Sequence, residues 1–215
     1  IQIPEYASML IGAYAGGVNV TRGQLQSPSL RRIVNYEIRG INIGAEPLSP
    51  PVVSMFPYAP IQLDVDEQMQ AYMSEDGAGA TAVIILVWLA DAPLTPVEGE
   101  IFTVRVTNAS TLVANVWTNG ALVFDQVLPV GRYAIVGARF ESAGLVAFRF
   151  LFQGSTPRPG GIGCDLGADI EHSYQRFGKM GVWGEFQSTT PPTVDFLSIS
   201  ADTAQVGALD LIKVS

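Results

Sequence analysis

LPVGRYAIVGARFESAGLVAFRFLFQ, residues Leu128 to Gln153, contains two runs of alternating residues joined by a short polar segment. Successive side chains of a β-strand point to opposite faces of the sheet. The second run, Leu145 to Gln153, therefore predicts a strand that buries one aromatic face and leaves Ala147, Arg149 and Leu151 on the other. The aromatic face consists of Val146, Phe148, Phe150 and Phe152.

The first run, Arg132 to Phe140, also alternates, and it predicts a second strand. One of its faces carries Ala134, Val136, Ala138 and Phe140. The connecting residues 141–144, ESAG, have the usual length of a hairpin connection. The sequence therefore predicts that the two strands form a β-hairpin, in a protein that is mainly β.

The same rhythm of strand and turn extends to both sides of this segment. Asn119-Gly120 lies between two apolar runs, and both residues tolerate the positive φ that a type I′ hairpin turn needs. It is the strongest hairpin signal in the chain. The further predicted strands are Ile33–Gly44, Thr81–Leu89, Ile101–Thr107, Leu112–Trp117, Ala121–Val127, Val194–Ser200 and Gln205–Val214.

Two other stretches predict different structure. Asp64 to Ser74 has acidic residues at its start and an apolar spacing of three and four residues, which predicts one short helix. Residues 46–60 contain five prolines, which fix φ and remove donors, so this stretch predicts an extended crossing loop. The apolar run Ala82 to Ala90 is too short to span a bilayer as a helix and predicts a strand covered on both faces.

About ten strands and one short helix near residues 64–74 favour two packed antiparallel sheets over parallel α/β units. We therefore predict an all-β sandwich with jelly-roll or Greek-key wiring. At 215 residues the chain is expected to be a single domain over residues 1–215. Residues 1–30 are weakly patterned and are a candidate extended N-terminal segment of that domain.

The composition is 48% hydrophobic and only 15% charged, whereas soluble domains carry about 25% charged residues. This balance indicates that part of the surface is covered by other copies of the chain. An uncharged, Gly- and Pro-rich secreted domain is the alternative. The net charge of −8 and the scattered basic residues argue against direct binding of nucleic acid.

Candidate catalytic and ligand groups are sparse. His172 is the only histidine, and no G-x-S-x-G motif accompanies it. Residues 160–167 have a G-x-G-x-x-x-G spacing that differs from the dinucleotide-binding motif, so a loop between strands is expected. Cys164 has no basic neighbour and is expected to be a small buried residue. We expect no enzymatic activity, no catalytic residue, no cofactor and no metal site.

Aromatic residues are the main candidates for subunit contacts. Trp88 lies in the apolar run and is expected in the core, whereas Trp117 and Trp183 are expected on the surface. Loops 45–60 and 154–170 are expected to contact neighbouring subunits. The residues predicted to make subunit contacts are Phe56, Tyr58, Trp117, Arg158 and Trp183.

LPVGRYAIVGARF followed by VAFRFLF, a Pro-rich bend and a Gly-rich aromatic strand resembles the later strands of jelly-roll viral capsid proteins, over roughly residues 80–215. Because the chain is acidic and has no basic arm, it looks more like those of tailless or membrane-containing double-stranded DNA viruses. The resemblance implies a coat subunit of the virion. Its partners would be other copies of itself, and also a second capsid protein or an internal membrane.

The alternative from another class is an extracellular β-sandwich module that binds carbohydrate or protein. Trp117 and Trp183 would then form a platform for a sugar ring. The two hypotheses differ in a simple property, because a coat subunit forms a large assembly whereas a lectin-like module binds specific glycans.

Overall fold

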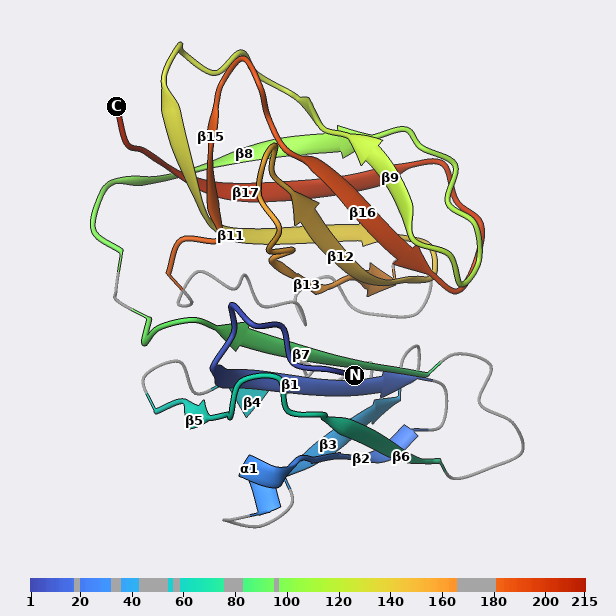
Figure 1. Cartoon of the computed structure of the whole chain (residues 1–215). Coiled ribbons are helices and arrows are strands. Elements are labelled where there is room, and N and C mark those ends of the chain that lie inside the picture. The colour runs from blue at the N-terminus through green and yellow to red at the C-terminus, as the bar shows by residue number, and fades with distance from the viewer. Residues whose placement is uncertain are drawn as a thin grey trace. The chain divides into compact units, whose positions relative to one another are not determined.

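The computed structural model describes residues 1–17, 20–31, 36–42, 54–55, 59–75, 83–94, 97–165 and 181–215. Nearly all of the regular structure in these ranges is strand, and the helix α1 spans only Pro28–Arg31 (Figure 1). The predicted all-β class is confirmed. None of the helical residues in the described ranges forms a segment long and apolar enough to cross a lipid bilayer.

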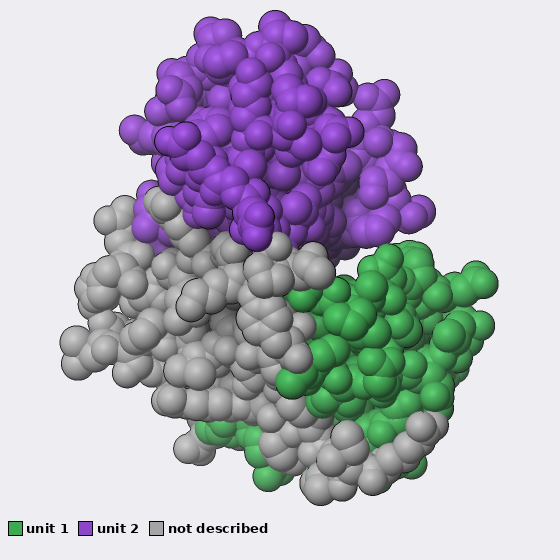
Figure 2. All heavy atoms as spheres, turned by 90° about the vertical axis from the view of Figure 1, so that its left-hand side faces the viewer, with its two compact units in different colours: residues 1–94 green, residues 95–215 purple. Residues whose placement is uncertain are grey.

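The chain's contacts divide it into two compact units, Ile1–Leu94 and Thr95–Ser215 (Figure 2). A single domain over residues 1–215 is expected from the sequence, whereas each of these units has its own sheets. The weakly patterned residues 1–30 contain two strands and α1 within the first unit. We call the units unit 1 and unit 2 and describe each by itself.

Unit 1 is built around β1, which pairs with β7 along most of its length and also with β3, β4 and β5. β2 links β3 to β6. The core between these elements contains small and aliphatic side chains, among them Leu10, Ala13, Ala15 and Leu25. The strands are β1 Met9–Gly17, β2 Val20–Gln26, β3 Tyr36–Asn42, β4 Ser54–Met55, β5 Ile61–Gln62, β6 Gln70–Glu75 and β7 Val83–Ala90.

The predicted helix over residues 64–74 is wrong. Asp66 has a φ of 60°, which is incompatible with a continuing right-handed helix, and Gln70–Glu75 is the strand β6. β6 pairs antiparallel with β2, with Ala71 opposite Leu25. The helical spacing of apolar residues is overridden because this segment obtains its backbone hydrogen bonds from the neighbouring strand.

Glu67, expected among the charges at the start of that helix, instead lies buried beside α1. Its carboxylate accepts hydrogen bonds from the Ser27 hydroxyl at 2.9 Å and from the Ser29 backbone N–H at 3.0 Å. The Ser27 oxygen in turn accepts from the Leu30 N–H at 3.2 Å, as an N-cap residue does. Glu67 therefore accepts hydrogen bonds from residues at the start of α1 and does not begin a helix of its own.

The apolar run at residues 82–90 forms the strand β7, as predicted. Trp88 is buried, and Ile85, Val87 and Leu89 pack against the core of unit 1. Complete cover on both faces is not observed, because most described residues of β7 are only partly buried.

Unit 2 has the wiring of a jelly roll. Its six-stranded sheet has the order β10-β8-β17-β11-β14, with β15 also on β11, and its four-stranded sheet has the order β13-β12-β16-β9 (Figure 1). The first long strand, β8, pairs with the last, β17, and β9 pairs with β16. The chain crosses between the sheets after β8, β9, β11, β13, β15 and β16, so strands far apart in sequence become neighbours. The predicted jelly-roll wiring is confirmed within unit 2.

The long strands of unit 2 follow the predicted ones closely. Residues 112–117 contribute only a single bridge at Ala114, and the predicted strand Ala121–Val127 is reduced to the end of β9 and the two residues of β10. The strands are β8 Ile101–Asn108, β9 Thr118–Ala121, β10 Val123–Phe124, β11 Arg132–Ser142, β12 Leu145–Leu151, β13 Gly160–Ile162, β14 Cys164–Asp165, β15 Gly184–Gln187, β16 Thr193–Ser198 and β17 Gln205–Lys213.

The predicted hairpin between β11 and β12 is wrong, although both strands exist. β11 belongs to the six-stranded sheet and β12 to the four-stranded sheet, so the turn at Ala143-Gly144 carries the chain from one sheet to the other. Gly144 has a φ of 68°, which favours glycine. The two apolar faces meet across the sandwich, where the rings of Phe140 and Phe148 lie 4.8 Å apart.

Asp202 fixes this turn between the sheets. Its carboxylate accepts hydrogen bonds from the Ser142 hydroxyl and from the Ala143 N–H. The bond from Ser142, followed by those from the Thr203 and Ala143 N–H groups, lowers the pKa of Asp202 below its ordinary value, and partial burial opposes this shift. Ionised Asp202 therefore stabilises the turn.

The predicted hairpin turn at Asn119-Gly120 is also wrong, because both residues lie inside β9. Gly120 pairs with Val194 and Asn119 with Asp195. A side chain at Gly120 would collide with Asn108. The glycine therefore permits a close approach between chain segments rather than a positive φ.

The interior of unit 2 is an aromatic cluster. The ring of Phe150 lies 6.0 Å from that of Phe140 and 5.8 Å from that of Phe148, and Phe140 and Phe196 meet edge to face at 5.1 Å. Such offset and edge-to-face contacts stabilise the core beyond simple burial. The aromatic face predicted from the alternation of β12 is confirmed.

Candidate interaction surface

The residues predicted to make subunit contacts have different locations. Phe56 and Tyr58 lie outside the described residues. Arg158 is exposed, and its guanidinium donates to the backbone carbonyls of Ser155 at 2.7 Å and Pro157 at 3.3 Å. These contacts hold Arg158 within its own loop.

Trp183 lies in the core rather than on the surface. Only 9% of the residue is exposed, and its indole stacks on Phe148 at 6.1 Å and meets Phe150 at 5.9 Å. The surrounding glycines suggested an exposed loop. Instead, Gly184 lets the ring of Phe152 approach the backbone closely.

Trp117 is partly exposed and lies beneath a cation. The guanidinium carbon of Arg149 is 4.2 Å from the centroid of the Trp117 ring, within the range of a cation–π contact. Arg149 occupies this position because the alternation of β12 sends Phe148 and Phe150 into the core and Arg149 to the opposite face. One face of the Trp117 indole is therefore already covered.

A row of polar side chains crosses three strands beside Trp117. Arg149 on β12 is opposite Asp195 on β16, which is opposite Asn119 on β9. The Nε of Arg149 donates to Oδ2 of Asp195 at 2.8 Å, and the Nδ2 of Asn119 donates to Oδ1 at 2.9 Å. We call Trp117, Asn119, Arg149 and Asp195 the polar row.

Sequence reasoning placed Arg149 on the correct face but missed its partners. The alternation of β16, in which Val194 and Phe196 point inward and Asp195 outward, was a signal for this. The strand register, which only the fold provides, was needed to bring the three polar side chains together.

A second feature is a loop with an exposed apolar tip, residues 125–131. Val127 is 96% exposed and Val130 is 86% exposed. Hydrogen bonds hold the base of the loop, because the Tyr133 hydroxyl donates to the Pro129 carbonyl at 2.8 Å and the Ser188 N–H donates to the Gly131 carbonyl at 2.9 Å. We call residues 125–131 the valine loop.

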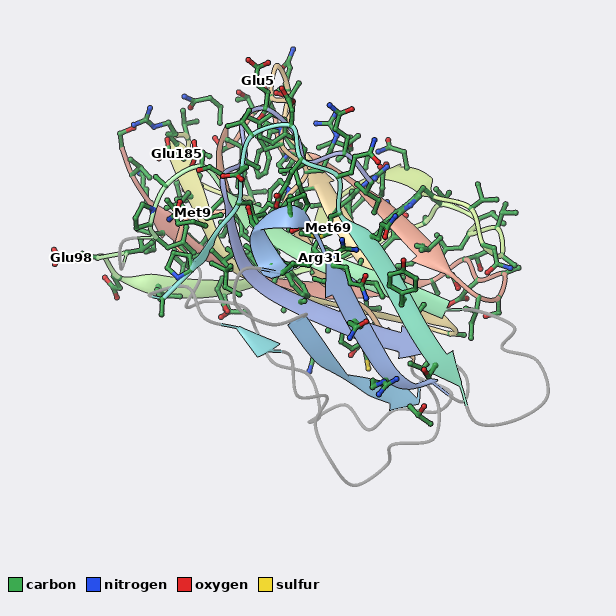
Figure 3. All side chains as sticks on the ribbon, turned by 60° about the horizontal axis from the view of Figure 1, so that its bottom comes forward. Glu5, Met9, Arg31, Met69, Glu98 and Glu185 are labelled. Carbon is green, nitrogen blue, oxygen red and sulfur yellow. The ribbon has the colours of Figure 1, made fainter. Side chains whose placement is uncertain are left out.

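Other exposed aliphatic side chains of unit 2 share the β-branched character of the valine loop. They are Ile101, Val113, Val116, Val123, Val182 and Val214. Val182 and Val214 also line an open groove together with Phe102, Glu98 and Glu185. The two carboxylates are labelled in Figure 3, and Glu185 pairs with Arg132 at 3.1 Å.

The residues considered as candidates for chemistry are buried, lie in a strand or fall outside the described residues. Cys164 is completely buried, as expected. Gly160–Ile162 forms β13, so this part of the glycine-rich stretch is strand, and His172 lies outside the described residues. In the part of the chain that the structure covers, no group of three or more His, Cys, Asp or Glu side chains is placed to hold a metal ion.

No known protein family and no curated protein matches the sequence. Among solved structures, the chain is similar to the major capsid protein P2 from bacteriophage PM2, with 12% identity over all of this chain and 91% of that chain and a TM-score of 0.28. A TM-score this low does not establish a shared fold.

Proposed function

We propose that the protein is a structural subunit, a viral coat protein that assembles with copies of itself. The observation that carries this proposal is the valine loop, which holds Val127 and Val130 in water on a fixed backbone. Burying a valine side chain contributes roughly 1.5 kcal/mol or more. Because the loop is tied down at Tyr133 and Ser188, these side chains are best buried by another molecule.

The composition and the wiring of unit 2 support the same role. Only 15% of the residues are charged, so contacts between copies require little desolvation of charge. Jelly rolls occur in viral capsids and in lectins, and the wiring alone does not choose between them. The choice depends on the surface residues.

The surface favours a coat subunit over a sugar-binding module. A lectin platform would use the free face of an exposed aromatic ring. Trp183 is buried in the aromatic cluster, and Arg149 covers one face of Trp117. On this proposal the protein is located in the virion, catalyses no reaction, and has other copies of itself as its main partner.

Native mass spectrometry and electron microscopy of the purified chain test the proposal. The parent is expected to form a large, regular assembly. The double substitution Val127→Asp/Val130→Asp should weaken the contact by about 100-fold, since about 3 kcal/mol of burial is lost. Gln126→Asp is the matched control, because Gln126 is exposed in the same loop and the substitution also adds a negative charge.

A parent chain that stays monomeric at high concentration contradicts the proposal. Equal loss of assembly in Gln126→Asp and in the double variant would attribute the effect to charge and remove its main support. Specific binding of the parent to a glycan array, lost in Trp117→Ala, would favour the sugar-binding alternative instead.

A further inference from the structure

Resting on the proposed self-assembly, we infer that Arg149 binds a carboxylate of a second copy of this chain. The valine loop provides an apolar contact, which does not set the orientation of a partner. The polar row provides a charged donor in a fixed orientation. The row lies across β9, β16 and β12 of the four-stranded sheet of unit 2 (Figure 1).

The guanidinium of Arg149 is held in place by two contacts. Its Nε donates to Asp195 at 2.8 Å, and its central carbon lies over the Trp117 ring, 4.2 Å from the ring centroid. Asp195 is itself fixed, since only 9% of its side chain is exposed and its second oxygen accepts from Asn119. The orientation of Arg149 is therefore largely set before any partner arrives.

The terminal Nη groups of Arg149 donate no hydrogen bond to the described residues, and 37% of the side chain is exposed. A guanidinium presents five N–H donors in a planar fork that matches a carboxylate. Asp195 uses one of these donors. The remaining donors suit a planar anion that approaches from the solvent side.

A second copy is the occupant that the charges favour. The chain carries 20 acidic and 12 basic residues, so each copy offers an excess of carboxylates to a neighbour. An exposed ion pair contributes little to binding, and a free carboxylate ion is therefore held weakly. A protein partner can also cover the flanking Leu151 and Leu197, which are partly buried and share the face of Arg149, and this exclusion of water strengthens the ion pair.

The test compares Arg149→Lys with Arg31→Lys. Lysine retains the charge beside Asp195 but has no planar fork, so Arg149→Lys should raise the concentration for half-assembly by about tenfold. Arg31→Lys should leave that concentration unchanged, because Arg31 is exposed on α1 of unit 1 and, among the described residues, its guanidinium donates only to the nearby Gln26, at 3.4 Å. Thermal unfolding of both variants, measured below the assembly concentration, should differ little from that of the parent.

The outcomes separate this inference from the proposed function. A parent that never assembles contradicts both. A parent that assembles, with Arg149→Lys assembling equally well, overturns only the role of Arg149. The alternative occupant is a sugar acid. It is tested by titrating the unassembled parent with glucuronate while the NMR signal of the Arg149 Nε–H is monitored. Saturation at millimolar glucuronate would assign the site to a sugar acid and overturn the second-copy assignment, whereas no saturable shift supports it.

Discussion

Unit 1 and unit 2 are both β structures, but their cores are built from different side chains. The largest fully buried residues of unit 2 are aromatic, among them Phe140, Phe148 and Phe150, whereas the main core cluster of unit 1 is built mostly from alanines, leucines and other aliphatic residues. The rings of Phe148 and Phe150 alternate with other residues along β12 and make its pattern visible in the sequence. In unit 1 strand pairing decides the structure of segments whose own pattern is weak or misleading, as in β6.

The largest effect is expected from breaking the aromatic core of unit 2. Phe150→Ala should lower the free energy of unfolding by about 3–5 kcal/mol, because the ring is fully buried against Phe140, Phe148 and Trp183. Denaturant unfolding below the assembly concentration measures this. Val127→Ala, at an exposed position, should change stability by less than about 0.5 kcal/mol. A loss below 1 kcal/mol for Phe150→Ala would contradict the aromatic core.

A smaller effect on stability is expected at Glu67. It distinguishes the observed structure of residues 64–74 from the helix that the sequence predicts there. Glu67→Gln should cost about 1–3 kcal/mol, because the buried carboxylate accepts from Ser27 and Ser29. If residues 64–74 formed a helix with Glu67 in its exposed first turn, the cost would be a few tenths of a kcal/mol. Glu5→Gln, at an exposed position labelled in Figure 3, is the control in the same denaturant titration.

The smallest effect concerns the turn that joins the two sheets of unit 2, and it depends on pH. The pKa of Asp202 is lowered in the folded state, so its contribution is present above the ordinary carboxyl pKa of about 4 and is lost as the pH falls through the lower, folded value. Asp202→Asn should therefore cost about 1 kcal/mol at pH 7 and progressively less below about pH 4.

Unfolding of parent and Asp202→Asn between pH 7 and pH 2 measures this difference. Asp125→Asn is the control, because Asp125 is exposed and its side chain makes no hydrogen bond to a described residue. A difference between parent and Asp202→Asn that stays constant over this range would show that the ionised carboxylate does not hold the turn.

The surface features were only partly predictable. Trp117 is partly exposed, as expected, but Trp183, which the sequence also places at the surface, is buried. The exposure of Val127 and Val130 was missed because an apolar segment beside a proline resembles the end of a buried strand. Burial depends on what packs above a residue, and local sequence does not contain that information.

The long strands β8, β11, β12, β16 and β17 and the buried face of β12 follow from the sequence alone, because alternation along one strand is a local property of the chain. Which strands pair is visible only in the folded protein. β11 and β12 pack face to face rather than edge to edge, and Asn119-Gly120 lies within a strand. The physical reason is that pairing and register depend on hydrogen bonds and ring contacts between residues far apart in the chain, and these bring Arg149, Asp195 and Asn119 into one row.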